Sequence, residues 1–267
     1  MGDKITVPHI LKMKQRGDKI TCLTAYDYSF ARILDEAGVE ILLVGDSLGC
    51  VVQGGPNTLA VTLDEMIYHT RAVVRGRKRA LVIGDMPFMS YQVSREQALQ
   101  NAGRFFKEAG AEAIKVEGGV AVRDSIHAIV SAGMPVMGHV GLTPQSVHQF
   151  GGYKIQGREQ HRREAVMRDA LAVEEAGAFA VVLEAMPLDL AQEITERLTI
   201  PTIGIGAGMH CDGQVLVIHD MLGLYEDFTP KFVKQFANIK SGVSGAVKEF
   251  IGAVKEKTFP AEEHSFK

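Results

Sequence analysis

The sequence contains no tryptophan and only three cysteines, Cys22, Cys50 and Cys211, among 267 residues. An odd number of cysteines without CxxC spacing argues against a disulfide framework and against a zinc cluster. We therefore expect a protein of a reducing compartment, the cytoplasm. The amino terminus has no apolar core of the kind found in signal peptides, so no export signal is expected.

A basic surface is also missing. Lys and Arg total 29 against 32 Asp and Glu, a formal net charge of -3, and no long basic block interrupts this balance. Since nucleic-acid binding requires a positively charged surface, we expect no nucleic acid as a partner. The uncharged stretch between Asp124 and Lys154 is interrupted by histidine, glycine and proline, so no membrane span is expected.

Short apolar runs are what the sequence has in abundance. Continuous apolar runs are typical of parallel strands buried on both faces. Eight runs rich in Val, Ile and Leu recur with helical patterns between them, at residues 20–25, 40–45, 80–84, 113–116, 135–138, 178–183, 200–205 and 214–218. Eight strand–helix units in a chain of this length predict an α/β protein, a single (β/α)8 TIM barrel over residues 1–267. We expect an N-terminal helix within 1–17 and a C-terminal helical extension after Asn238; an open doubly wound sheet is the alternative.

Acidic residues come at or just after the ends of several predicted strands. In a TIM barrel the carboxyl ends of the strands form the active site, where Asp46, Asp85, Glu117 and Glu184 would meet. Closely packed carboxylates repel one another and resist burial, so we expect a cation among them. Hard oxygen ligands favour Mg²⁺, with Asp46 and Asp85 as ligands and Glu117 as a further candidate. A single Asp after a strand can instead cap a helix, but the parallel contexts VGDS and IGDM favour a shared site.

Basic residues and a candidate base belong to the same predicted end of the barrel. Lys115 lies two residues before Glu117, so both side chains point into the barrel if the strand extends that far, and Lys115 suits a substrate carboxylate. His139 is either a hydrogen-bonded core residue or part of the site. Glu184 ends the run AVVLE without an adjacent basic residue and suits a general base, although a helix cap is the alternative.

The stretch 143–168 is expected to be the longest irregular connection, and connections of that length are often lids. It contains four arginines, Arg158, Arg162, Arg163 and Arg168. These either meet an anionic cosubstrate or form a solvated helix face.

Several longer motifs resemble one known family over residues 5–236. They are LTAYDYSFA, VGDSLG, GDMPFMSY, IKVEGG, GHVGLTPQSVHQFGGYKIQGR, VLEAMP, IPTIGIGAG and HDMLGL. In these motifs the sequence resembles the ketopantoate hydroxymethyltransferases. The resemblance implies transfer of a one-carbon unit from 5,10-methylenetetrahydrofolate to the keto acid 3-methyl-2-oxobutanoate, giving 2-dehydropantoate for pantothenate and coenzyme A biosynthesis.

The resemblance also implies roles for individual residues and an assembly. Glu184 is the implied catalytic base, which forms an enolate stabilised by Mg²⁺. The implied metal ligands are Asp46 and Asp85, with Glu117 as a direct or water-mediated ligand. The residues implied to bind the keto acid are Asp46, Ser47, Asp85 and Lys115, with His139 in support. Family members are homo-oligomers, decamers of barrels.

Two other functions remain open on the sequence alone. One is a Mg²⁺-dependent lyase or mutase similar to isocitrate lyase and phosphoenolpyruvate mutase, which generally use a cysteine or another acid in a mobile loop. The 143–168 stretch contains no cysteine, which argues against this function. The other is a non-catalytic barrel, against which the intact set Asp46, Asp85, Lys115 and Glu184 argues.

Overall fold

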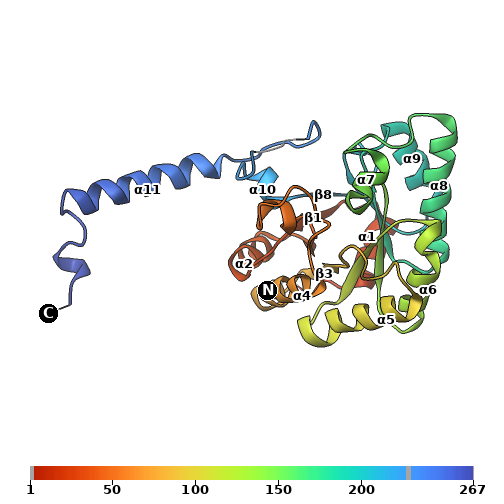
Figure 1. Ribbon diagram of the computed structural model, residues 1–267, viewed down its shortest axis with the longest axis horizontal. Coiled ribbons are helices and arrows are strands. Elements are labelled where there is room, and N and C mark those ends of the chain that lie inside the picture. The colour runs from red at the N-terminus through yellow and green to blue at the C-terminus, as the bar shows by residue number, and fades with distance from the viewer. Residues whose placement is uncertain (1–2, 227–229, 267) are drawn as a thin grey trace. The chain divides into compact units, whose positions relative to one another are not determined.

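Eight parallel strands close into a barrel in this computed structural model, which describes residues 3–226 and 230–266 (Figure 1). The strands follow one another around the barrel in chain order, and β1 pairs with both β2 and β8. Their bounds are β1 (Ile20–Thr24), β2 (Ile41–Val44), β3 (Leu81–Asp85), β4 (Ala113–Glu117), β5 (Val136–Gly141), β6 (Ala180–Glu184), β7 (Thr202–Ile205) and β8 (Gly213–Leu216). The predicted TIM barrel is confirmed, and closure between β1 and β8 excludes the open sheet.

Helices connect the strands and cover the barrel from outside (Figure 1). Their starts follow local sequence, as at α4, where Thr62 and Glu65 exchange hydrogen bonds in a capping box. The connecting elements are α2 (Tyr28–Ala37), α3 (Leu48–Val51), α4 (Leu63–Gly76), α5 (Arg95–Arg104), η1 (Phe105–Ala109), η2 (Val120–Val122), α6 (Arg123–Ser131), η3 (Pro144–Ser146), α7 (Val147–Phe150), α8 (Gln160–Glu175) and α9 (Leu188–Arg197).

The barrel interior is apolar toward the amino-terminal ends of the strands. Its buried core includes Cys22, Ile83 and Val182, and α1 (Val7–Arg16) adds the fully buried Ile10 to the same cluster. Lys14 of α1 holds this helix in place through an ion pair of 2.8 Å with Asp212, which precedes β8. Because α1 covers this end, polar chemistry is confined to the opposite, carboxyl-terminal end.

The stretch 143–168 is mostly helical, which corrects the expectation of a long irregular connection. It contains η3, α7 and the start of α8, and only Thr143 and residues 151–159 lack helical structure. Arg162 and Arg168 are exposed on α8, and Arg163 pairs with Asp189 at 2.8 Å. Arg162 and Arg168 therefore lie on a solvated helix face, as one of the two interpretations predicts, whereas Arg163 is partly buried beside acidic residues of α9.

The chain divides into two compact units, Met1–Val217 and Ile218–Lys267. All eight strands belong to the first unit; the second contains α10 (Ile218–Met221), α11 (Ile239–Lys255) and η4 (Glu262–His264). The expected C-terminal helical extension is present as α11, whose first turn is capped by Asn238. A single domain over the whole of 1–267 stays a prediction. Across the described residues, every helix is too short or too polar to span a bilayer.

Candidate active site

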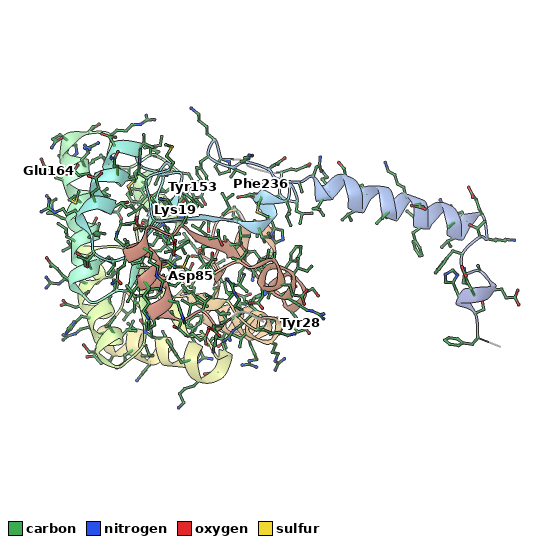
Figure 2. All side chains as sticks on the ribbon, turned by 180° about the vertical axis from the view of Figure 1, so that it is seen from behind. Lys19, Tyr28, Asp85, Tyr153, Glu164 and Phe236 are labelled. Carbon is green, nitrogen blue, oxygen red and sulfur yellow. The ribbon has the colours of Figure 1, made fainter. Side chains whose placement is uncertain are left out.

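Three carboxylates meet at the carboxyl ends of neighbouring strands. Asp46 follows β2 after one glycine, Asp85 is the last residue of β3, and Glu117 is the last of β4. One oxygen of each carboxylate lies within 4.8 Å of the others, and all three residues are buried. Asp85 is labelled in Figure 2. Parallel pairing produces this meeting, because it brings the ends of β2, β3 and β4 to the same end of the barrel.

Lys115 supplies a cation inside this cluster. Its Nζ lies 2.8 Å from Oδ1 of Asp85 and 3.3 Å from Oε1 of Glu117. β4 extends through Glu117, so Lys115 and Glu117 share the interior face as the spacing predicts. Burial disfavours the charged amine, but the attraction of Asp85 and Glu117 prevails and raises the pKa of Lys115. The ammonium therefore stays charged.

One ammonium does not balance three buried carboxylates. Burial, followed by repulsion from Asp85 and Glu117, raises the pKa of Asp46 well above its ordinary value. Burial also raises the pKa of Asp85, against the attraction of Lys115. For Glu117, burial is outweighed by Lys115 and His139, which lower its pKa to about 2. A divalent cation would relieve this repulsion, and the donor set of carboxylate oxygens fits a hard ion such as Mg²⁺.

His139 of β5 connects the acidic cluster to Glu184 of β6. Its Nδ1 lies 3.4 Å from Oε1 of Glu117, and its Nε2 lies 3.1 Å from Oε2 of Glu184. Burial and Lys115 act to lower the pKa of His139, but its contacts with Glu117 and Glu184 raise it to about 9. Glu184 lacks a basic neighbour along the chain, yet the fold supplies one from the adjacent strand.

Glu184 is the most accessible of these acidic groups. Its side chain is 13% exposed, whereas that of Asp85 is 1% exposed. Ser47 is half-buried, and its Oγ lies 2.8 Å from the hydroxyl of Tyr26, the second residue after β1. The structure thus brings all the predicted site residues to the carboxyl-terminal end of the barrel, on the ends of β2 to β6.

Sequence reasoning missed two buried residues of this site, Gln145 and Tyr91. Gln145 donates hydrogen bonds to carboxylates of both Asp46 and Glu117. The hydroxyl of Tyr91 donates to Oε1 of Gln145 at 2.7 Å. Both residues lie within motifs that carry the family resemblance, GDMPFMSY and GHVGLTPQSVHQFGGYKIQGR, and that is the only sequence feature that points to them.

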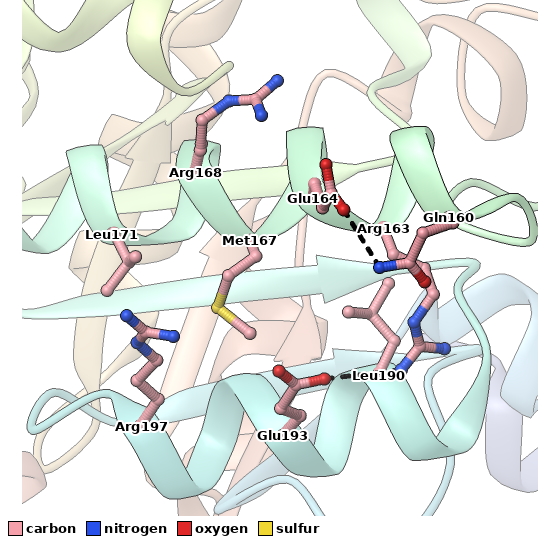
Figure 3. A pocket seen from close by; sticks show the side chains of 9 residues that line it. All are labelled: Gln160, Arg163, Glu164, Met167, Arg168, Leu171, Leu190, Glu193 and Arg197. Carbon is pink, nitrogen blue, oxygen red and sulfur yellow. Dashed lines mark hydrogen bonds and ion pairs between the residues drawn. The ribbon is translucent and has the colours of Figure 1, made fainter.

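A separate cavity of about 340 Å³ lies between α8 and α9 (Figure 3). Met167 and Leu190 line it together with charged residues such as Arg163 and Glu193, which pair at 3.4 Å. None of the residues that line it belongs to the acidic cluster, and both helices lie outside the barrel.

The fold and the acidic cluster define a TIM-barrel protein with a candidate divalent-metal site at the carboxyl-terminal end of its strands. Among solved structures, the barrel is similar to phosphoenolpyruvate phosphomutase from Streptomyces platensis subsp. rosaceus. The TM-score is 0.65 with 14% sequence identity, over 98% of this chain and 92% of that one. At this low sequence identity, the structural similarity establishes that the two proteins share a fold.

Closer relatives establish the family. The sequence profile of the family described as ketopantoate hydroxymethyltransferase matches residues 4–262. The chain is 59% identical over 265 residues to 3-methyl-2-oxobutanoate hydroxymethyltransferase of Syntrophus aciditrophicus (strain SB), covering 99% of this chain and 97% of the relative. It is 58% identical over 266 residues to the protein of the same name from Geobacter metallireducens (strain ATCC 53774 / DSM 7210 / GS-15), covering 100% of each. The chain belongs to the ketopantoate hydroxymethyltransferase family and is an enzyme, a transferase.

Proposed function

We propose that the protein transfers a hydroxymethyl group from 5,10-methylenetetrahydrofolate to 3-methyl-2-oxobutanoate, forming 2-dehydropantoate for pantothenate and coenzyme A biosynthesis. The observation that carries the proposal is the cluster of Asp46, Asp85 and Glu117, with carboxylate oxygens within 4.8 Å of one another, beside a lysine and a more exposed glutamate. The names of the full-length relatives support the same reaction.

Asp46 and Asp85 would hold Mg²⁺, with Glu117 as a further ligand or as the partner of a coordinated water. When bound, Mg²⁺ supplies positive charge that stabilises the negative charge developing on the C2 oxygen of the keto acid. Asp46, Ser47 and Asp85 would also contact the keto acid. Lys115, whose ammonium is held by Asp85 and Glu117, would also attract the substrate carboxylate.

Glu184 would act as the general base and take the proton from C3 of the keto acid. The electron pair of the broken C–H bond moves into the C2–C3 bond, and the carbonyl electrons move to the C2 oxygen. Nε2 of His139 lies 3.1 Å from Oε2 of Glu184, so a protonated His139 would orient the Glu184 carboxylate as its ion-pair partner. His139 therefore supports the base rather than exchanging the substrate proton itself.

C3 of the resulting enolate would form a bond to the methylene carbon of the folate, both C–N bonds of that carbon would break, and water would supply the hydroxyl oxygen of the product. One proton of the water and the proton taken up by Glu184 would end on the two nitrogens of the departing tetrahydrofolate. The barrel would accelerate this step mainly by holding the two reactants in contact, because the entropy cost of bringing them together is then met by binding and not in the chemical step. From the family resemblance we further propose a homo-oligomer, a decamer, that works in the cytoplasm. Sedimentation equilibrium would test the decamer.

The decisive test is formation of 2-dehydropantoate from 3-methyl-2-oxobutanoate, 5,10-methylenetetrahydrofolate and Mg²⁺. We expect turnover that is lost on chelation with EDTA and restored by Mg²⁺. Absence of product with either the folate or formaldehyde as donor would reject the transferase reaction. Cleavage of a 2-hydroxy or 2-oxo dicarboxylic acid instead would favour the lyase function.

A further inference from the structure

We propose that Gln145 is a positioning residue for the divalent-metal site, holding Asp46 through its side chain and Glu117 through its backbone. The inference rests on the metal site of the proposed function. It assigns Gln145 no contact with the substrate and no part in proton transfer.

The first observation is that one residue reaches two carboxylates on different strands. Gln145 lies in η3, the short helical turn that follows β5. Its Nε2 donates to Oδ2 of Asp46 at 3.0 Å, and its backbone N–H donates to Oε2 of Glu117 at 3.0 Å. Asp46 follows β2 and Glu117 ends β4, so Gln145 links the two carboxylates on either side of β3.

The second observation is that the Gln145 amide uses its full hydrogen-bonding capacity on the protein. Beside Asp46, its Nε2 donates to the carbonyl oxygen of Met86 at 3.0 Å. Its Oε1 accepts from the Tyr91 hydroxyl at 2.7 Å and from Nε2 of Gln92 at 3.2 Å. A primary amide has two N–H donors and two acceptor lone pairs, and these four contacts occupy all of them.

The orientation of this amide is fixed by its partners. The carbonyl oxygen of Met86 only accepts hydrogen bonds, so it must face the NH₂ group of Gln145, and the same group then faces Asp46. Gln145 is 6% exposed and Tyr91 is 1% exposed, so water competes little for these bonds. The side chain is therefore a rigid donor toward Asp46.

Such a donor organises the carboxylates for a cation. It holds Oδ2 of Asp46 and Oε2 of Glu117, which fixes the rotation of both groups. Oε1 of Glu117 then faces Lys115 and His139, and the second oxygen of Asp46 is left for other partners. Hydrogen-bond partners that orient metal ligands typically contribute 10–100-fold to metal affinity. Gln145 should make a contribution of this size to the affinity of the protein for a divalent ion.

The test measures binding of Mn²⁺ alone to the full chain after EDTA treatment, with free Mn²⁺ followed by electron paramagnetic resonance. Gln145→Leu removes the side-chain donors and keeps the backbone N–H. Gln149→Leu is the matched control, because Gln149 is an exposed glutamine on the adjacent helix α7. We expect the Kd for Mn²⁺ to rise 10–100-fold in Gln145→Leu and to change less than twofold in Gln149→Leu.

Two further variants separate positioning from a general loss of packing. Gln145→Met keeps the length of the side chain and removes both N–H donors without adding a charge, so it should weaken Mn²⁺ binding about as much as Gln145→Leu. Tyr91→Phe removes one contact with Gln145 and should weaken binding less, with an effect that is not additive with Gln145→Leu. If Gln145→Leu fails to fold, Gln145→Met and Tyr91→Phe provide the test.

The outcomes distinguish the inference from the proposed function. A folded Gln145→Leu with the wild-type Kd for Mn²⁺ would overturn the inference and leave the metal site intact. Wild-type protein that binds no Mn²⁺ would overturn the metal site and the inference together. A change in the unfolding temperature of the metal-free protein with unchanged Mn²⁺ affinity would show a merely structural role and also overturn the inference.

Discussion

The imidazole Nε2 of His139 lies 3.1 Å from Oε2 of Glu184, across the neighbouring strands β5 and β6. The other ring nitrogen of His139 lies 3.4 Å from Oε1 of Glu117. One buried ring therefore contacts both the proposed base and a proposed metal ligand. This arrangement places the proposed base directly beside the acidic cluster, and the side chain of Glu184 is more exposed to solvent than that of Glu117.

The first prediction concerns the base. Glu184→Gln keeps the size of the side chain and removes its ability to accept a proton, so exchange of the C3 proton of the keto acid into deuterium oxide should fall at least 100-fold. Binding of the keto acid should stay within threefold of wild type. Proton NMR would measure the exchange, and calorimetry the binding. Exchange at the wild-type rate would remove Glu184 from the role of base.

The second prediction concerns the metal. Asp85→Ala removes a carboxylate from the cluster and leaves Lys115, previously 2.8 Å from that carboxylate, to repel a cation. Mg²⁺ affinity should fall at least tenfold in titration calorimetry. Asp124→Ala, an exposed aspartate on α6, is the control and should bind Mg²⁺ like wild type. Equal affinity in both variants would contradict the assignment of Asp85 as a ligand.

The third prediction concerns Gly141, the last residue of β5. It has φ +94°, and a Cβ built on it would lie 2.3 Å from the carbonyl oxygen of Glu184. Gly141→Ala must therefore move the backbone that carries Glu184, and it should cost about 3 kcal/mol or more in free energy of unfolding. Activity should also fall in the protein that remains folded.

Gly133→Ala is the matched control for Gly141→Ala. Gly133 also has a positive φ, +86°, but a Cβ there meets nothing within 4 Å. Gly133→Ala should therefore lower the free energy of unfolding by only about 1–2 kcal/mol, from the backbone conformation alone. Denaturant unfolding measures both variants, and equal losses would show that the contact with Glu184 does not constrain position 141.

The fourth prediction concerns stability and pH. The buried carboxylate of Asp35, on α2, accepts hydrogen bonds from the backbone N–H groups of Lys78, Arg79 and Ala80 just before β3. Burial acts to raise its pKa, but these bonds prevail and lower the pKa below the ordinary value. Asp35→Asn weakens these hydrogen bonds and should lower the free energy of unfolding by about 2 kcal/mol at pH 7.

The pH dependence of this loss has a defined sign. Because the pKa of Asp35 is lower in the folded state, its stabilisation is full above the unfolded-state pKa of about 4 and is lost as the pH falls through the folded-state value. The difference in unfolding free energy between wild type and Asp35→Asn should therefore shrink below about pH 4. Glu36→Gln, on the exposed face of the same helix, is the control and should show a much smaller difference at either pH. A difference that grows in acid would contradict this account.

Most strands were predictable because they are continuous apolar runs, although β1 and β8 each contain an exposed polar residue, Thr21 and Gln214. The eight expected runs all correspond to strands, with ends that differ by three residues or fewer. The largest difference at a functional end is in β5, which was expected to stop at Gly138 and continues through His139 to Gly141. Glycine and histidine interrupt the apolar pattern there, although the backbone pairing with β6 continues.

The network around Gln145 was not predictable in the same way. A glutamine in a turn such as η3 is ordinarily exposed, and nothing in the local pattern LTPQS requires its burial. It becomes buried because the connection after β5 crosses above the ends of other strands and brings it to Asp46, 99 residues away along the chain. The start of α8, inside the stretch expected to be irregular, was also misjudged, since its many charged residues obscure the few apolar positions that face the barrel.

Two features follow from the amino-acid sequence without knowledge of the fold: eight parallel strands that alternate with helices, and acidic residues at the strand ends. Both follow from local rules: apolar periodicity specifies which segments are buried, and parallel pairing brings equivalent strand ends together. The contacts between individual atoms, such as those of His139 with Glu184 and of Gln145 with Asp46, depend on the folded chain. Hydrogen bonds and ion pairs act over about 3 Å, and groups distant in sequence come that close only when closure of the barrel fixes their positions.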